Sequence, residues 1–188
     1  MRTNIYLVRH AESPFRYGEE RERGISEAGA QAAKRVADLL RMEGIDVVVT
    51  SPYARALLTV QPLAEQLKLP IHSYEGLHER FVEGDHQVSW EAKKQAVKKS
   101  FEDPDYAMDG GESTREAQQR VIPILMDLLD TYHGKRIVIG THGNIMTVMM
   151  NYYDQSYGYD FWEQTTMPDI YRMTFEGNQL LQIVRLWN

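Results

Sequence analysis

The sequence has no cysteine among its 188 residues and no long hydrophobic run. The lack of cysteine excludes disulfide scaffolds, thiolate zinc and iron–sulfur sites, and phosphatases or proteases with a cysteine nucleophile. No stretch approaches the roughly 18 apolar residues of a membrane span. The apolar run 5–8 near the N-terminus is also too short for the hydrophobic region of a signal peptide. We therefore expect a cytoplasmic protein with no membrane partner.

Positive charge is also scarce. The 21 Lys and Arg residues are outnumbered by 27 Asp and Glu residues, for a net charge of −6. Nucleic acids need clustered positive charge on their protein partners, so we expect no nucleic-acid binding. The length corresponds to about one domain, and no repeat, low-complexity tract or Gly/Ser/Pro-rich linker divides the chain. The sequence therefore predicts a single domain over residues 1–188.

Short β-branched apolar runs alternate with helical patterns along the chain. Such runs are typical of strands that are buried on both faces of a sheet. They lie at 5–8, 47–49 and 137–139. The helical patterns include one that Ser26 caps and Gly44 ends, one over 54–67 that Pro62 is predicted to kink or divide, and one that opens with the capping box Ser113–Glu116.

Strands that alternate with helices indicate an α/β fold, a three-layer sandwich with a largely parallel central sheet and helices on both faces. Residues 171–175 and 180–186 predict a C-terminal hairpin, because turn residues separate two apolar segments. Residues 81–110 are polar and irregular, with one helical pattern at 89–99. We interpret 81–110 as an insertion over the active-site edge of the sheet.

Arginine and histidine follow the buried strands at the points where these end. Arg9 and His10 follow the first strand, Arg55 comes shortly after the second, and His142 follows the third. The carboxyl ends of parallel strands meet at one edge, where α/β proteins bind ligands. A structural hydrogen bond explains any one of these residues, but four together favour a site. Two arginines repel each other unless an anion lies between them, and phosphate suits their forked geometry.

Metal binding is the alternative for this cluster, because His10, His142 and Glu79 are all ligand types. Arg9 and Arg55, however, would place positive charge beside a divalent cation, and no close His-x-x-x-His or Asp-rich spacing is present. The sequence also lacks the G-x-S-x-G, P-loop and G-x-G-x-x-G motifs. We therefore predict neither a metal nor a cofactor.

Five motifs, in order along the chain, resemble those of the histidine phosphatase superfamily, the phosphoglycerate mutase-like proteins. They are Leu7-Val8-Arg9-His10-Ala11-Glu12-Ser13, Ser51-Pro52-Tyr53-Ala54-Arg55-Ala56, Leu77-His78-Glu79-Arg80, Gly110-Gly111-Glu112-Ser113 and Gly140-Thr141-His142-Gly143. The resemblance covers residues 5 to about 150. It departs from the family pattern at Ala11, where a glycine is usual, and at Arg16, where the mutases often have asparagine.

The resemblance implies a role for each matching residue. His10 would be the nucleophile that forms a phosphohistidine, while Arg9, Arg55 and His142 would hold the phosphoryl oxygens. Glu79 would protonate the leaving oxygen and then activate water. Arg16 and Gly143 are the further candidates for phosphate binding. Gly143 would let the backbone approach the phosphate or would permit a tight turn.

Three functions are compatible with these residues. A phosphatase and a cofactor-dependent phosphoglycerate mutase share the chemistry and differ in the acceptor of the phosphoryl group. A catalytically idle phosphate- or phosphoprotein-binding domain would need the arginines but neither His10 nor Glu79. In the family that this sequence resembles, the mutases are typically longer, and residues 13–26 match the mutase pattern poorly. We therefore predict hydrolysis of a small phosphorylated metabolite through a phosphohistidine.

Overall fold

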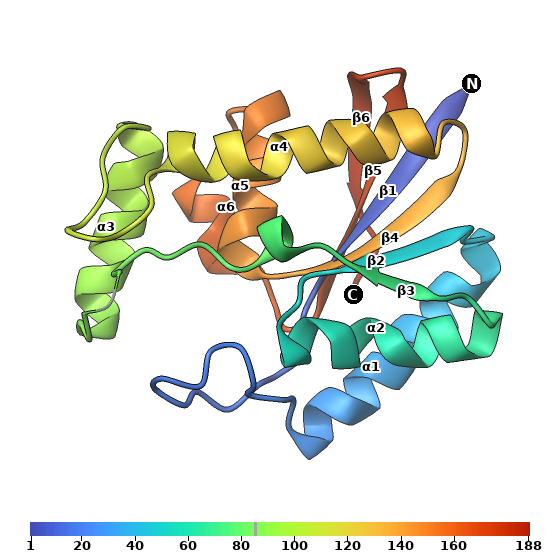
Figure 1. The fold of residues 1–188 in the computed structure, drawn as a ribbon, viewed down its shortest axis with the longest axis horizontal. Coiled ribbons are helices and arrows are strands. Elements are labelled where there is room, and N and C mark those ends of the chain that lie inside the picture. The colour runs from blue at the N-terminus through green and yellow to red at the C-terminus, as the bar shows by residue number, and fades with distance from the viewer. Residues whose placement is uncertain (85) are drawn as a thin grey trace.

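The computed structural model describes residues 1–84 and 86–188, and its centre is a mixed β-sheet (Figure 1). Within the described residues the six strands follow the order β3-β2-β4-β1-β5-β6. The four parallel strands are β1 (Arg2–Arg9), β2 (Val47–Thr50), β3 (Ile71–Ser73) and β4 (Arg136–Thr141). The antiparallel pair is β5 (Asp169–Glu176) and β6 (Gln179–Arg185). The α/β class, the largely parallel sheet and the C-terminal hairpin are confirmed.

Helices cover both faces of this sheet. The helices α1 (Glu27–Leu40) and α2 (Ala54–Leu67) cover one face, whereas α4 (Thr114–Thr131) and α5 (Gly143–Tyr153) cover the other (Figure 1). Successive side chains of a strand point to opposite faces, which explains why the runs are apolar throughout. In β1, Ile5 and Leu7 belong to the cluster under α4 and α5, while Tyr6 and Val8 belong to the cluster under α1 and α2.

The expected caps of α1 and α4 are present. Ser26 Oγ accepts a hydrogen bond from the backbone N–H of Gly29 at 3.0 Å. Ser113 and Glu116 form both bonds of the capping box, at 3.1 and 2.8 Å. After α1, a short 3₁₀ turn leads to Gly44, whose φ of 68° is left-handed and suits glycine.

Of the two outcomes predicted for Pro62, a kink or a division of the helix, the division does not occur. The helix α2 runs unbroken over Ala54–Leu67 with Pro62 inside it. A proline removes one i→i−4 hydrogen bond, here that to the carbonyl of Leu58, but this leaves the remaining turns intact. Two elements were not predicted, the edge strand β3 and the short helix α6 (Tyr159–Gln164). The strand has only three residues, two of them exposed, so it carries no apolar run.

The segment 81–110 contains the helix α3 (Trp90–Glu102), which is longer than the predicted 89–99. Ser89 caps it by accepting the N–H of Ala92 at 3.1 Å. A small apolar cluster joins this segment to α6 through Val82, Ala96, Val97 and Trp162. The helix stands at the end of the molecule opposite the N-terminus (Figure 1).

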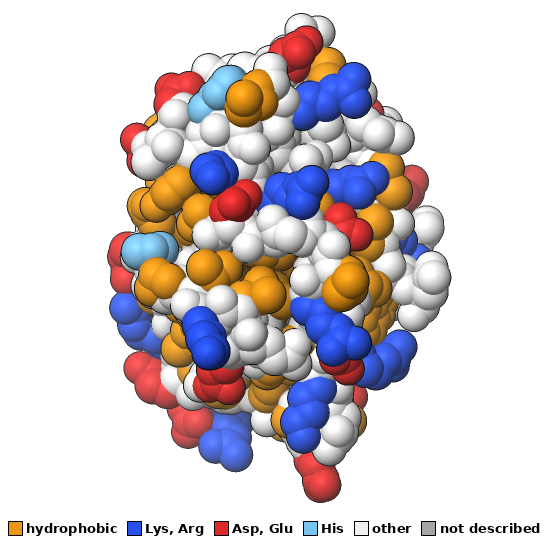
Figure 2. Space-filling view, turned by 90° about the vertical axis from the view of Figure 1, so that its right-hand side faces the viewer, with side chains coloured by type: hydrophobic (Ala, Val, Ile, Leu, Met, Phe, Trp, Pro, Cys, Tyr) orange, Lys and Arg blue, Asp and Glu red, His pale blue; other side chains and the backbone are white. Residues whose placement is uncertain are grey.

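Charges of both signs are interspersed on the face that Figure 2 shows, where Lys and Arg side chains lie beside Asp and Glu side chains. Neither sign forms a continuous patch there. Across residues 1–84 and 86–188, none of the helices has the length and apolar character that crossing a membrane requires.

Candidate active site

The carboxyl ends of β1 and β4 place His10 beside His142. These strands are parallel neighbours with Arg9 opposite Thr141, and the N–H of His10 continues the ladder by donating to the Thr141 carbonyl at 2.9 Å. The two imidazole rings stand edge to face, with their centroids 5.3 Å apart. Next to β4, the strand β2 leads into α2, whose second residue is Arg55. The structure thus brings together residues that three separate segments supply.

A backbone contact determines the tautomer of His10. Its Nδ1 lies 2.8 Å from the carbonyl oxygen of Ala11, which can only accept a hydrogen bond. Nδ1 must therefore carry the proton. The remaining nitrogen, Nε2, keeps its lone pair, as a nucleophile requires when the ring is neutral.

Burial and positive neighbours keep both histidines neutral. The pKa of His10 lies well below its usual range because the ring is buried, and the charge of Arg55 lowers it further. The pKa of His142 is lowered in the same way, first by burial and then by Arg55. Near pH 7 both imidazoles are therefore uncharged, and the Nε2 lone pair of His10 is not lost to a proton.

The two arginines at the strand ends are held from different sides. Arg9 Nη1 donates to the carbonyl and the hydroxyl of Thr165, at 2.9 and 2.6 Å. Arg55 is only 1% exposed, and its Cζ lies 5.0 Å from the centre of the Tyr53 ring. Burial lowers the pKa of Arg55 to about 10, so the guanidinium remains charged at neutral pH. Both side chains are positive and line the same cavity as His10.

His142 lies behind His10 rather than in the open space of the site. It is completely buried, and its Nε2 lies 2.7 Å from the hydroxyl of Ser51. Gly143 begins α5, and a Cβ atom at this position would lie 2.8 Å from Cζ of Arg9. The glycine therefore makes room for the arginine, an explanation that the sequence did not indicate.

Glu79 reaches the site from the loop after the 3₁₀ turn Glu75–Leu77. Its carboxylate accepts three backbone N–H groups, from Arg80 at 2.9 Å, Asn144 at 3.1 Å and Ile145 at 2.8 Å. The last two belong to the first turn of α5, where unpaired N–H groups attract a negative charge. The helix that follows His142 thus also fixes the position of Glu79.

Arg16 lies away from this cluster. Its side chain is 66% exposed and forms an ion pair with Glu19 at 3.4 Å, so the structure does not place it in the expected phosphate site. Arg23 lies there instead, only 12% exposed, with Nη1 2.7 Å from the hydroxyl of Ser13. Sequence reasoning missed Arg23 because residues 10–26 have no periodic pattern that would tell one loop arginine from another.

The carboxylate of Glu20 bridges Arg23 and Arg55. One oxygen, Oε2, lies 3.2 Å from Nη2 of each arginine, and the Glu20 carbonyl also accepts from Arg55. A carboxylate oxygen in this position shows that the two guanidinium groups converge closely enough to share an anion. Asn144 is a further residue that the sequence did not single out, with a buried amide nitrogen that has no hydrogen-bond partner among the described residues.

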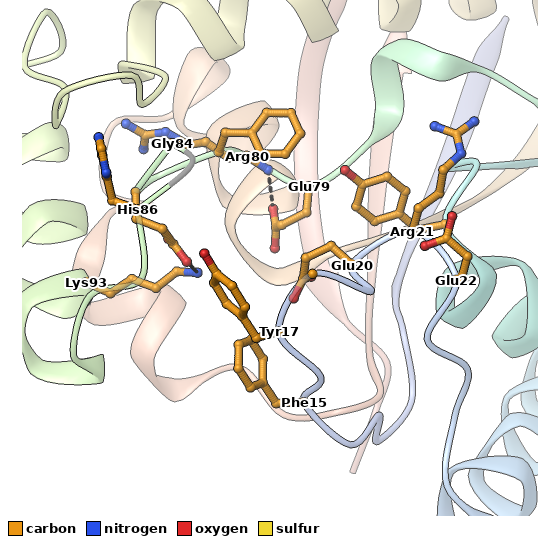
Figure 3. Close-up of a pocket in the computed structure, with 14 residues that line it drawn as sticks. Phe15, Tyr17, Glu20, Arg21, Glu22, Glu79, Arg80, Gly84, His86 and Lys93 are labelled. Atoms are coloured by element: carbon orange, nitrogen blue, oxygen red, sulfur yellow. Dashed lines mark hydrogen bonds and ion pairs between the residues drawn. The ribbon is translucent and has the colours of Figure 1, made fainter.

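Two adjoining cavities lie at this cluster, and His10 lines one of them. The inner cavity, of about 410 Å³, is lined by Arg9, His10, Arg23 and Arg55 at its polar end. The outer cavity, of about 370 Å³, is lined by side chains such as Tyr17, Arg21 and His86 (Figure 3). Phe15, Glu20, Glu79, Arg80, Glu83 and Lys93 line both. Among the residues that the structure describes, no three His, Asp or Glu side chains gather as metal ligands would.

The chain belongs to the histidine phosphatase superfamily (branch 1), whose family model matches residues 5–188. Phosphoserine phosphatase 1 of Hydrogenobacter thermophilus is 29% identical over 159 residues, which are 77% of this chain and 73% of that protein. Phosphoglycerate mutase-like protein 4 of Arabidopsis thaliana is 34% identical over 156 residues, which are 76% and 67% of the two chains.

Solved structures share the fold at low sequence identity. A phosphoserine phosphatase of Entamoeba histolytica, in complex with 3-phosphoglyceric acid, superposes with a TM-score of 0.80 at 21% identity, covering 99% of this chain and 98% of the other. A mycobacterial glucosyl-3-phosphoglycerate phosphatase with inorganic phosphate gives a TM-score of 0.79 at 17% identity, covering 98% and 96%.

Proposed function

We propose that this protein hydrolyses phosphomonoesters through a phosphohistidine formed at Nε2 of His10. The observation that carries the proposal is the tautomer of His10, whose Nδ1 proton is held by the Ala11 carbonyl. Membership of the histidine phosphatase superfamily supports it, as does the name of the Hydrogenobacter relative, a phosphoserine phosphatase.

In the first step, Nε2 of His10 attacks phosphorus while the bond to the leaving oxygen breaks in line. Arg9, Arg55 and Arg23 hold the three equatorial oxygens, where negative charge accumulates in the transition state. The substrate phosphate displaces the Glu20 carboxylate from Arg23 and Arg55. His142 lies behind His10, and its buried ring packs edge to face against the His10 ring, next to Arg55.

Glu79 transfers the protons of both steps. It gives a proton to the leaving alcohol in the first step and removes one from water in the second, when water attacks the phosphohistidine and frees His10. Its three N–H partners hold the carboxylate on the wall that both cavities share. The arginines supply the positive charge that a cation supplies in metal-dependent phosphatases, so the reaction needs no metal.

A mutase would transfer the same phosphoryl group to a second substrate oxygen, and a binding domain would retain the phosphate unchanged. The test is release of inorganic phosphate by the purified protein from a panel of phosphomonoesters. We expect turnover that EDTA does not reduce. Activity that EDTA abolishes and Mg²⁺ or Zn²⁺ restores would contradict the metal-independent mechanism. Tight phosphate binding without turnover would favour the binding domain.

Arg23, rather than Arg16, is expected to bind the phosphoryl group. Arg23→Ala should raise the inhibition constant of vanadate roughly 10- to 100-fold, the usual range for losing a hydrogen bond to a charged group. Arg16→Ala should change this constant less than about twofold, because exposed ion pairs contribute little. The measurement is competitive inhibition by vanadate of both variants. If Arg16→Ala raises the inhibition constant of vanadate more than Arg23→Ala does, Arg16 rather than Arg23 binds the phosphoryl group.

A further inference from the structure

The inner cavity has apolar as well as basic lining residues. The apolar ones are Phe15, Val82, Val88, Trp90, Trp162 and Met167. Phe15 is 65% and Trp90 62% exposed, an unfavourable arrangement for large apolar side chains that nothing covers.

These side chains are concentrated at the site. Of the eleven large hydrophobic residues that are exposed in the described part of the chain, five line the two cavities. The five are Phe15, Tyr17, Phe81, Trp90 and Met167. In Figure 3, Phe15 and Tyr17 project from the loop after β1 into the space below Glu79 and Lys93. The part of a substrate beyond its phosphate would therefore contact apolar surface.

The cations at the outer end of the cavities are already paired within the protein. Lys93 Nζ lies 2.9 and 2.8 Å from the two carboxylate oxygens of Glu83. Arg21 makes a two-pronged pair with Glu75, at 2.7 and 2.9 Å. Each of these two cations thus has a carboxylate beside it that offsets its attraction for a substrate carboxylate.

Two further arginines, Arg80 and Arg23, line the inner cavity. Arg80 is buried, and its Nε donates to the Glu112 carbonyl at 2.9 Å. Arg23 faces the phosphate end, together with Arg9 and Arg55. A carboxylate on the leaving group would instead lie near Glu83, which also lines the inner cavity and carries the same sign.

We propose that the substrates of this site are phosphomonoesters of uncharged, apolar alcohols or phenols, and that esters with a carboxylate near the phosphate are poor substrates. This inference rests on the hydrolase function proposed above and specifies its leaving group. The arginines bind the phosphate of either kind of ester. Discrimination between substrates therefore depends on the apolar side chains that contact the leaving group.

Three alkyl phosphates test the proposal because their alkoxide leaving groups have comparable chemistry. They are 2-phenylethyl phosphate, glycerol 3-phosphate and 3-phosphoglycerate. We expect KM for 2-phenylethyl phosphate to be at least about tenfold lower than for 3-phosphoglycerate, in keeping with burial of an apolar ring. Equal constants, or a lower one for 3-phosphoglycerate, would overturn the proposal. If none of the three releases phosphate, the hydrolase function itself fails.

Substitution of the apolar lining residues tests whether they discriminate between substrates. Met167→Ala and Trp90→Ala should each raise KM for 2-phenylethyl phosphate about five- to tenfold, with little change for glycerol 3-phosphate. Leu181→Ala is the matched control, since Leu181 is an exposed apolar residue of β6 that lines neither cavity. If the two variants raise KM for both substrates equally, the apolar lining residues do not select the leaving group.

The paired lysine offers a gain-of-function test. Glu83→Gln removes the negative charge that offsets Lys93 and leaves the ammonium group with a net positive charge where the two cavities meet. The kcat/KM ratio of 3-phosphoglycerate to 2-phenylethyl phosphate should then rise several-fold. A ratio that does not change would show that Glu83 does not exclude carboxylates, and would contradict the electrostatic half of the proposal.

Discussion

Replacing His10 with alanine is expected to abolish turnover of every phosphomonoester, with kcat reduced at least about a thousandfold. The variant loses the only atom that we assign to attack on phosphorus, so the quality of the leaving group cannot compensate. Arg9, Arg55 and Arg23 remain in place, and inorganic phosphate should still bind, although more weakly. Steady-state kinetics with aryl and alkyl phosphates measure the first effect, and calorimetric titration with phosphate measures the second.

His72→Ala is a suitable control for this experiment. His72 is an exposed residue of the edge strand β3, away from both cavities, and its loss should leave kcat unchanged. Substantial activity in the His10 variant would exclude the phosphohistidine route. Water attacking phosphorus directly would then be the better explanation, with the arginines and Glu79 as the remaining catalytic groups.

Replacing Glu79 with glutamine is expected to separate substrates by their leaving groups. A p-nitrophenolate ion departs with little help from a proton, whereas an alkoxide needs one. Glu79→Gln should therefore reduce kcat/KM for 2-phenylethyl phosphate by roughly 10²–10⁴-fold, the range of general acid catalysis, and that for p-nitrophenyl phosphate far less. Glutamine keeps one oxygen for the N–H groups of Arg80 and Ile145 and loses only the acceptor for Asn144, so the side chain should remain in position.

The second step of the reaction gives an independent readout of the same variant. Without a base to activate water, the phosphohistidine should accumulate when p-nitrophenyl phosphate is the substrate. A burst of p-nitrophenolate followed by slow turnover would reveal it. Glu65→Gln, on the exposed side of α2, is the matched control. Equal losses for both substrates with no burst would reassign the proton transfer to Glu83 or Glu20, the other carboxylates that line both cavities.

The main features of the fold were predictable because they depend on local patterns. The apolar runs in β1, β2 and β4 are buried on both faces, and Ser26 and Ser113 satisfy the first N–H groups of their helices through their own side chains. The strand β3 and the helix α6 are too short to have such a pattern. Both are held by neighbours, β3 by pairing with β2 and α6 by the cluster around Trp162.

The loop between β1 and α1 shows where sequence reasoning reaches its limit. It contains Arg16, Arg21 and Arg23, and the family pattern directed attention to Arg16. The structure places Arg23 in the inner cavity because Ser13 and Glu20 hold its guanidinium there, while Arg16 remains at the surface. Spacing alone does not distinguish these arginines, since an irregular loop has no periodicity.

The sequence by itself determined which side chains meet at the sheet edge. Parallel strands end on the same side, so Arg9, His10 and His142 had to converge once β1 and β4 were recognised. Only the tertiary structure decided which nitrogen of His10 is free, which loop arginine lines the inner cavity, and that Lys93 and Arg21 form ion pairs with Glu83 and Glu75. These properties depend on contacts between distant segments, such as the bond from the Ile145 N–H to Glu79, 66 residues earlier. Such contacts arise when the chain packs, and no local pattern encodes them.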